Sequence, residues 1–431
     1  MKRLLSIFAV VFVVVIGCQS TDTETAVEPR TTQPPPAEEP PPTAVPPTET
    51  APPPTEEPQA ADFSELEQAL QGVVDAQVDA GFPGAILMVD APDLGFSWKG
   101  AAGMADIEGE IPMEPETPFH VSGISDTLMA ALVLKLAEEG IVGLDDPISQ
   151  YLDAAIVEQL NGPDGEPYGE AITVRHLLKG TSGVAGYFLR DEEDKDRSNT
   201  PDFIEIIVED PDKVWQPEEI IAYTTANLSP SSAPGEKYAA NDLGGVLLGM
   251  IVETVTGSTL NEAYQTRLFE PLGMENTFAV QGSDRRIGDI AHAYLLNSVD
   301  VTDNASLSWF SNDVVSTVTD LDRFMRAWAD DKIFSDPASK EAMMDWTSMA
   351  DAGYEGLYYG PGLIKFDFAQ TELPEIGEIM FQVSDWNGFV YYLPQHNVVL
   401  IGTLNRVMPF TSYDELAFPA VMAILPYVTE G

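Results

Sequence analysis

The sequence is poor in cysteine, in basic residues and in long apolar runs, and each shortage excludes a class of protein. A single cysteine among 431 residues allows neither an internal disulfide nor a metal site built from cysteine ligands. The 21 Lys and Arg residues are outnumbered by 70 Asp and Glu residues, and the net charge of −49 argues against binding to nucleic acid or to anionic membrane surfaces. No apolar run reaches the roughly 18 residues of a membrane-spanning helix.

The first eighteen positions have the pattern of a bacterial export signal that ends in a lipid attachment site. Lys2 and Arg3 are basic, and residues 4–16 form an apolar run that suits a signal peptide better than a membrane span. The run ends in Val15-Ile16-Gly17-Cys18, which resembles a lipobox. We therefore expect residues 1–17 to be removed and Cys18 to carry the lipid, because attachment of more than one chain gives stable anchoring. An ordinary signal sequence that contains a cysteine by chance is the alternative.

Residues 18–61 are predicted to form a disordered tether rich in Pro, Glu and Thr. Prolines 34–36, 40–42 and 52–54 form runs that favour the extended polyproline II conformation. Aromatic side chains are absent from this segment and aliphatic ones are few, so it cannot form a core. Fully extended, it would reach on the order of 120 Å and hold an anchored domain away from the membrane. A ligand for a proline-binding module is the alternative.

Residues 62–431 are predicted to fold as one α/β domain. The apolar fraction of the whole chain, 44%, is enough to form a hydrophobic core. Hydrophobic periodicity predicts helices at about 64–80, 125–139, 172–179, 216–224 and 244–256, and a closing helix from about 413. Strand-like runs occupy 84–90, 95–100, 380–383, 389–393 and 398–404. Ser64 is expected to cap the first helix. Strands at both ends predict a sheet built from both termini, with a mostly helical insertion at about 150–275.

Short motifs follow one another along this domain in a characteristic order. They are Pro83-Gly84-Ala85, Gly103-Met104-Ala105-Asp106, Thr117-Pro118-Phe119, Leu144-Asp145-Asp146-Pro147, Thr181-Ser182-Gly183, Pro234-Gly235 and Glu270-Pro271-Leu272-Gly273-Met274. Together they resemble the serine β-lactamase and penicillin-binding protein (DD-peptidase) superfamily, in particular its class-C-like branch. The resemblance implies a β-lactamase/transpeptidase-like fold, with an antiparallel sheet flanked by helices and a substrate cleft.

The resemblance also implies where a catalytic nucleophile should lie. The superfamily opens a helix with a nucleophilic serine and places a lysine three residues later, so that one helical turn brings the amine to the hydroxyl. The matching segment, Ser122-Gly123-Ile124-Ser125-Asp126, has Gly123 at the serine position and Asp126 at the lysine position. Ser122 and Ser125 are fallback nucleophiles, but neither has a lysine three residues on. We interpret Ser122, Ser125 and Asp126 as capping residues of the helix.

The two other catalytic motifs of the superfamily are substituted as well. Counted from Pro234-Gly235, the Tyr-x-Asn motif has Ala240 at the tyrosine position and Asp242 at the asparagine position. In the strand at 380–383, the His-x-Gly or Lys-Thr-Gly motif falls on Gln382 and Ser384. No histidine or lysine lies in that strand under any register.

These substitutions predict a cleft of changed chemistry. Its expected lining is Asp126, Asp242, Gln382, Ser384 and Trp386, which suits a neutral or cationic ligand better than an anionic one. Tyr238 is interpreted as a packing residue, and Asn241 lies one residue too early to restore the motif. The four histidines, His120, His176, His292 and His396, show no metal-ligand spacing, so we predict structural roles for them and neither metal nor cofactor. The acidic run at 191–196 lacks the glycine-centred loop of an EF-hand.

Loss of the nucleophile alone lowers the catalytic rate of a serine hydrolase on the order of a million-fold, so the usual activity of the family does not follow from the resemblance. Three hypotheses about function remain open. The first is a non-catalytic pseudoenzyme at the bacterial cell envelope. It would be anchored through Cys18 on the outer side of the cytoplasmic membrane, or on the outer membrane, and would bind a cell-wall or envelope-protein ligand. The second is a serine hydrolase of altered mechanism, of DD-peptidase, β-lactamase or esterase type. The third is a structural or salt-adapted surface protein without a cleft ligand.

Overall fold

The computed structural model describes residues 62–163, 165–186, 213, 215–239, 242–280, 290–295, 299–302, 314–384, 388–407 and 414–429. The predicted signal peptide at 1–17, the lipidation site Cys18, the tether at 18–61 and the acidic run at 191–196 lie outside these residues. Ala240, Asn241 and Trp386 lie outside them too.

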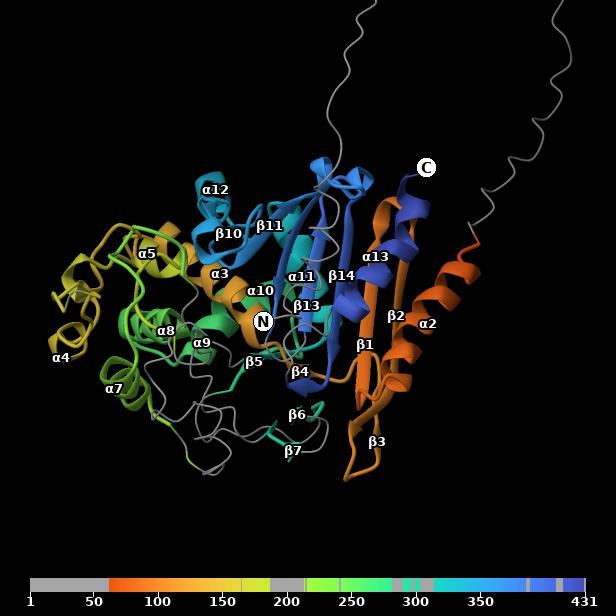
Figure 1. The fold of residues 1–431 in the computed structure, drawn as a ribbon, viewed down its shortest axis with the longest axis horizontal. Helices are drawn as coiled ribbons and strands as arrows, with labels where there is room; N and C mark the ends of the chain where they lie inside the picture. The colour runs from red at the N-terminus through yellow and green to blue at the C-terminus, as the bar shows by residue number, and fades with distance from the viewer. Residues whose placement is uncertain are drawn as a thin grey trace, which may run out of the picture.

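A nine-stranded antiparallel sheet forms the centre of the domain, with strand order β3-β2-β1-β14-β13-β12-β11-β10-β9 (Figure 1). Its strands are β1 (Gly84–Ala91), β2 (Phe96–Asp106), β3 (Ile111–Pro112), β9 (Thr347–Ser348), β10 (Tyr358–Gly360), β11 (Leu363–Asp367), β12 (Glu378–Val383), β13 (Gly388–Leu393) and β14 (Val398–Leu404). Because β1 pairs with β14, the N-terminal and C-terminal parts of the domain join in mid-sheet. The prediction of a sheet built from both termini is confirmed.

The central strands are buried on both faces, which explains their nearly continuous apolar runs. In β1, Ile86 and Met88 belong to the hydrophobic core on one face, whereas Leu87 and Val89 belong to the core on the other. This alternation follows from the two-residue period of a strand. The sheet therefore separates two hydrophobic cores.

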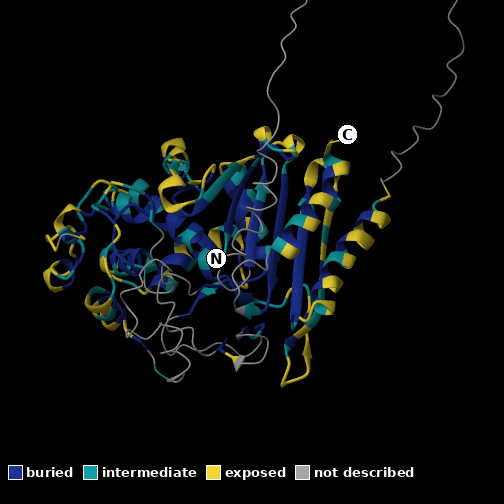
Figure 2. Ribbon diagram, viewed as in Figure 1, coloured by how far each residue is buried: buried dark blue, intermediate teal, exposed yellow. Residues whose placement is uncertain are grey.

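Helices cover both faces of the sheet. On one face lie α2 (Ser64–Asp79) and α13 (Asp414–Thr429), with their exposed sides turned to solvent (Figure 2). On the other lie α3 (Ser125–Glu138) and α11 (Val318–Ala329). The prediction that Ser64 caps the first helix is wrong. Ser64 is already the first residue of α2, and its backbone N–H donates to the Asp62 carboxylate at 3.0 Å.

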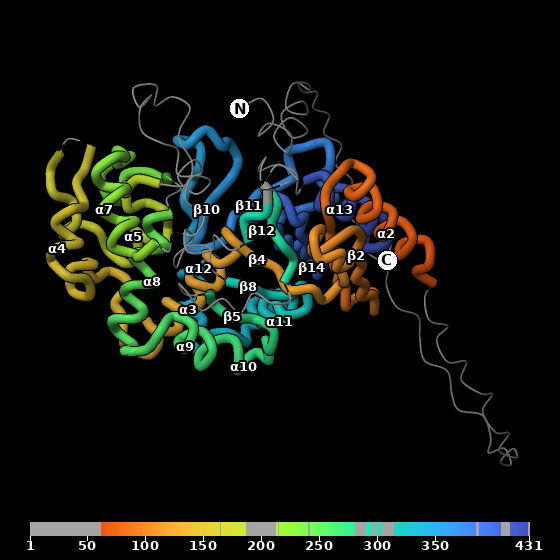
Figure 3. The backbone as a smooth tube through the Cα atoms, turned by 90° about the horizontal axis from the view of Figure 1, so that it is seen from below, coloured from red at the N-terminus to blue at the C-terminus, as the bar shows by residue number. Residues whose placement is uncertain are grey.

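A helical region packs against α3 on the side away from the sheet (Figures 1 and 3). Its helices are α4 (Ala154–Val157), α5 (Val174–Leu178), α7 (Pro217–Asn227), α8 (Asp242–Thr256), α9 (Leu260–Tyr264) and α10 (Glu270–Leu272), with a π-helical turn at Gln265–Phe269. They fall within the range where the sequence predicted helices. A further helix, α12 (Pro337–Met343), also contacts α3.

Two small three-stranded sheets complete the fold within the described residues. One has the order β4-β8-β5, made of β4 (Phe119–His120), β8 (Val314–Ser316) and β5 (Phe278–Ala279). The other has the order β15-β6-β7, made of β15 (Arg406–Val407), β6 (Tyr294–Leu295) and β7 (Val299–Asp300). No single helix in the described part of the chain is long and apolar enough to cross a membrane. Only α8 taken together with 260–272, across a 74° bend, passes by length and composition.

The helix α11 is fixed to the sheet by Arg326. Its guanidinium donates to the Asp90 carboxylate at 2.8 Å and to the Asp90 backbone carbonyl at 2.7 Å. Asp322, one turn earlier on α11, has an oxygen 3.6 Å from Arg326 Nε. Burial raises the pKa of Asp322 to about 7, the negative charge of Asp90 adds to this, and Arg326 and Arg323 oppose it.

The stability of the domain should consequently depend on pH through Asp322. Because its pKa is about 7 when folded and near 3.8 when unfolded, the folded state binds the extra proton, and stability falls as the pH rises across this interval. Asp322→Asn removes this dependence. The free energy of unfolding of the variant relative to the parent should increase by ~1–3 kcal/mol from pH 4 to pH 7.5, as measured by urea denaturation. A difference that stays constant over this range would contradict the assignment; exposed Glu67→Gln is the control.

Candidate functional site

The candidate site lies where the start of α3 meets the end of β12. Residues Ser122–Ile124 form a 3-10 turn that leads directly into α3. Ser122 has φ +46°, in the left-handed region that residues other than glycine seldom adopt. Most of the 14 residues of α3 are buried, so the helix is held firmly between the sheet and the helical region. The start of α3 is thereby fixed in position.

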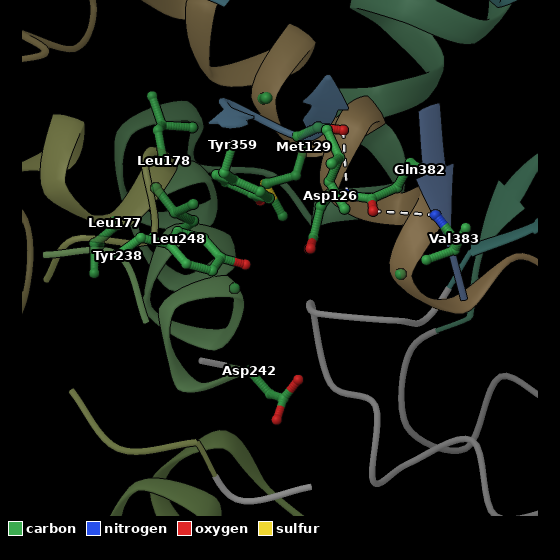
Figure 4. Close-up of a pocket in the computed structure, with 16 residues that line it drawn as sticks. Asp126, Met129, Leu177, Leu178, Tyr238, Asp242, Leu248, Tyr359, Gln382 and Val383 are labelled. Carbon is green, nitrogen blue, oxygen red and sulfur yellow. Dashed lines mark hydrogen bonds between the residues drawn. The ribbon is translucent and has the colours of Figure 1, made fainter. Parts of the chain in front are cut away.

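A cavity of about 180 Å³ opens at this point. Its lining includes four positions that the motifs singled out: Gly123 before α3, Asp126 on α3, Asp242 on α8 and Gln382 on β12. The carboxylates of Asp126 and Asp242 point into the same opening (Figure 4). Apolar side chains form much of the remaining wall, namely Met129, Leu177, Leu178, Leu248 and Ile364. The structure thus brings together residues that lie far apart in the sequence.

Gly123, at the serine position of the nucleophile motif, is closely packed. A β-carbon built there would lie 2.5 Å from the backbone carbonyl oxygen of Val383, which is closer than real contacts allow. A side chain at position 123 would therefore require the end of β12 to shift. The backbone at this point fits glycine.

Gln382, at the histidine position of the third motif, is tied to the neighbouring backbone. Its Nε2 donates to the carbonyl oxygen of Gly362 at 3.3 Å, and its Oε1 accepts the backbone N–H of Val383 at 3.1 Å (Figure 4). Ser384 is buried, accepts the backbone N–H of Gly388 at 3.2 Å, and is not among the described residues that line the cavity. Gln382 thus contributes to the wall, whereas Ser384 holds the turn into β13.

The fallback nucleophiles Ser122 and Ser125 are buried, with exposed fractions of 0% and 1%. Neither is among the described residues that line the cavity. Their hydroxyls make no hydrogen bond within the described structure. The interpretation of the two serines as helix caps is therefore wrong. The physical reason is that the 3-10 turn continues into α3, where the backbone N–H of Ser125 already pairs with Ser122 and Gly123 carbonyls. Asp126 lies in the first turn of α3, which favours a negative charge.

Two tyrosines that the motif comparison did not select also line the cavity. Tyr238 and Tyr359 are buried, and their ring centroids lie 4.9 Å apart at an interplanar angle of 38°. Burial raises the pKa of Tyr238, and the charges of Asp126 and Asp242 raise it further. Tyr238 does pack, as the sequence predicted, but it is also part of the site. Tyr359 had no sequence signal, because only strand pairing in the C-terminal half of the sheet brings it to α3.

The histidines have structural contacts away from the cavity. Burial lowers the pKa of His120 to about 4, so its ring is neutral at physiological pH. His176 forms a reciprocal capping box with Thr173 at the start of α5. The remaining two bind oxygen atoms: His292 Nδ1 lies 2.7 Å from Asp300, and His396 Nε2 lies 2.8 Å from the Glu375 carbonyl. Among the described residues, no group of three or more His, Cys, Asp or Glu could hold a metal ion.

Gly362 provides a test of how tightly the site is built. It has φ +72°, and an added β-carbon would lie 2.5 Å from the Asp126 carbonyl oxygen. Gly273 has a similar φ of +68° but open space around it. Both Gly→Ala changes should lower the free energy of unfolding, because alanine is strained in the left-handed region. Gly362→Ala should lower it by ~1–3 kcal/mol more, because α3 must also move. Urea denaturation measures both variants; equal losses would show that α3 is not held against Gly362.

Comparison with known proteins agrees with this architecture. A family model described as Beta-lactamase matches residues 63–418. Penicillin-binding protein 4* of Bacillus subtilis (strain 168) is 25% identical over 366 residues, which cover 80% of this chain and 72% of that protein. Esterase EstB of Burkholderia gladioli is 30% identical over 191 residues, 44% of this chain and 45% of the esterase. A solved D-stereospecific amidohydrolase from Streptomyces sp. superposes with a TM-score of 0.63 at 24% identity, over 81% of this chain and 97% of that one, which demonstrates the shared fold.

Proposed function

This chain belongs to the beta-lactamase family, and from that premise we propose that it is a non-catalytic member that binds a ligand of the bacterial cell envelope in its changed cleft. The observation that carries the proposal is the composition of the cavity wall. Gly123 occupies the nucleophile position, and the described lining residues include no Ser, Thr, Cys, Lys or His. The described part of the wall therefore offers no serine, threonine, cysteine or lysine as the nucleophile of an acyl transfer.

The chemistry of acyl transfer explains why this matters. A serine nucleophile needs a neighbouring base to take its proton and an open path to the substrate carbonyl. Gly123 has no hydroxyl. Asp126 replaces the lysine base, and its position in the first turn of α3 stabilises the carboxylate and makes it a weaker base. Both halves of the nucleophile–base pair are thus missing, so the family fold remains without its usual site chemistry.

One observation favours the alternative of a hydrolase with an altered mechanism. Ser122 combines φ +46° with a buried hydroxyl that has no hydrogen-bond partner in the described structure. Strained residues of this kind are concentrated at active sites. If the 3-10 turn opened, Ser122 would become available to a substrate, although no lysine would lie at the required spacing.

Covalent labelling distinguishes the two functions. The purified protein is incubated with a fluorophosphonate and, separately, with a labelled penicillin, and its intact mass is measured. We expect no adduct, because neither fallback serine lines the cavity. Near-ultraviolet circular dichroism confirms that the sample is folded, and a reactive serine hydrolase serves as the positive control. A stoichiometric adduct on Ser122 or Ser125 would establish the hydrolase alternative.

Anchoring at the cell envelope is the second part of the proposal, and the sequence alone supports it. The basic Lys2 and Arg3, the apolar run at 4–16 and Gly17-Cys18 favour lipid attachment at Cys18. The proline-rich segment at 18–61 would then separate the domain from the membrane.

In a bacterial host with a lipoprotein pathway, Cys18→Ala should abolish membrane attachment, because the chain has no other cysteine to which a lipid could be attached. Gln19→Ala is the matched control and should leave attachment unchanged. Cell fractionation and mass spectrometry of the mature N-terminal peptide measure both. Membrane attachment of the Cys18→Ala protein equal to that of the parent would exclude lipid anchoring.

A further inference from the structure

A cluster of titratable side chains joins two parts of the fold outside the cavity. His292 leads into β6 of the small β15-β6-β7 sheet, Asp300 lies on β7, and Asp106 ends β2 of the large sheet. The Nδ1 atom of His292 lies 2.7 Å from the Asp300 carboxylate and 3.8 Å from the Asp106 carboxylate. One imidazole thus stands between two carboxylates that come from different sheets.

The surrounding hydrogen bonds show that this cluster holds the small sheet against the end of β2. The backbone N–H of His292 donates to the carbonyl oxygen of Ala105 at 2.8 Å. The backbone N–H of Ile107 donates to the Tyr294 hydroxyl at 2.8 Å, and this hydroxyl donates to the Asp106 carboxylate at 3.5 Å. The contact therefore links β2 to the start of the β6–β7 hairpin.

Asp300 is held in an orientation that presents one carboxylate oxygen to His292. Its Oδ1 accepts the backbone N–H of Thr302 at 2.9 Å and the Thr302 hydroxyl at 2.6 Å, while its Oδ2 faces His292. Burial acts to raise the pKa of Asp300, but hydrogen bonds from Thr302 and His292 and the charge of His292 outweigh it, so the pKa is lowered from 3.8. Asp300 is therefore ionised in neutral and in mildly acidic solution.

The charge balance of the cluster depends on these two carboxylates and the imidazole. Tyr294, whose ring centroid lies 6.3 Å from that of His292, stays a neutral phenol because burial raises its pKa. Glu108 and Glu110, in the turn between β2 and β3, are exposed and form no ion pair with His292 in the described structure. Arg406, the charged residue of β15, lies over a phenylalanine ring at 5.1 Å.

The strength of the contact depends on whether the imidazole carries one proton or two. A neutral imidazole donates one N–H to Asp300, and the two carboxylates on either side of it repel each other. A protonated imidazole attracts both carboxylates and makes a charge-assisted hydrogen bond. Histidine is the side chain that ordinarily changes its charge between pH 5 and 8. The contact should therefore be tight in mildly acidic solution and weaken as the pH rises.

We propose that His292 is a pH-sensitive latch, which in its protonated form holds the β6–β7 hairpin against the end of β2 and in its neutral form loosens this contact. The side chains of His292 and Asp300 are 27% and 44% exposed, so the latch can exchange protons with solvent. The inference concerns a contact outside the cavity and does not depend on the proposed function.

The test is amide hydrogen exchange of the full chain at pH 5.5 and pH 8.0, which bracket the usual titration of histidine. Mass spectrometry measures it, with correction for the intrinsic rate. The reporters are the amides of Ala293 and Val301, which donate to Thr302 Oγ1 and to the Ala293 carbonyl, each at 2.9 Å. Amides of β14 in the same sample reveal any change in global stability. We expect the reporter amides to be about threefold to fivefold better protected at pH 5.5, the effect of a partly exposed ion pair.

Two variants and a matched control decide the result. His292→Gln keeps a side-chain N–H donor but cannot carry a charge, and should bring the ratio of protection to about one. Asp300→Asn keeps the acceptor for Thr302, removes the charge and should lower the ratio too, so it remains informative if the His292 variant fails to fold. His396→Gln changes a histidine that contacts the Glu375 carbonyl and should leave the ratio unchanged. A parent ratio near one, an unchanged ratio in both cluster variants, or an equal loss in the control would overturn the inference.

Discussion

The carbonyl oxygen of Gly362 joins the three segments that build the site. It accepts the hydroxyl of Thr127 on α3 and, at 3.3 Å, the side-chain amide of Gln382 on β12, while Gly362 itself connects β10 to β11. The absence of a β-carbon lets the backbone of Gly362 approach the start of α3. Asp126, Tyr359 and Gln382 therefore keep their relative positions because one backbone group holds the helix and the strands together.

The scaffold does not depend on the chemistry of the cleft. Its stability comes from two hydrophobic cores on either side of the sheet, in which residues such as Leu132 on α3 and Leu400 on β14 are fully buried. Among the described residues, the positions that match the family's catalytic motifs contribute no apolar side chain to these cores; they are Gly123, Asp126, Asp242, Gln382 and Ser384. Replacement of those groups therefore costs the folded state little, and a family fold can persist around a site with different chemistry.

The sequence predicted those features that short-range patterns determine. The apolar runs of β1 and β14 were sufficient to predict the sheet, and the helical periodicity of α3 was sufficient to predict its central helix. Counting from local motifs located Asp126, Asp242 and Gln382. Features that depend on long-range contacts were missed. Tyr359 reaches the cavity only through the pairing of β10 with β11, and the capping of α3 by serine failed because a 3-10 turn, which has no sequence signal of its own, precedes the helix.

The overall acidity and the acidity of the cleft have different physical consequences. A net charge of −49 is spread over a surface in contact with water and salt, where each charge interacts weakly and is screened within about 10 Å. Asp126 and Asp242 instead line a cavity beside buried tyrosines and apolar side chains, where the effective dielectric constant is lower and an opposite charge is attracted more strongly. A cation near the protein surface is therefore held loosely in many places. The two carboxylates in the cavity wall therefore interact with a nearby charge more strongly than an exposed member of the 70 acidic residues does.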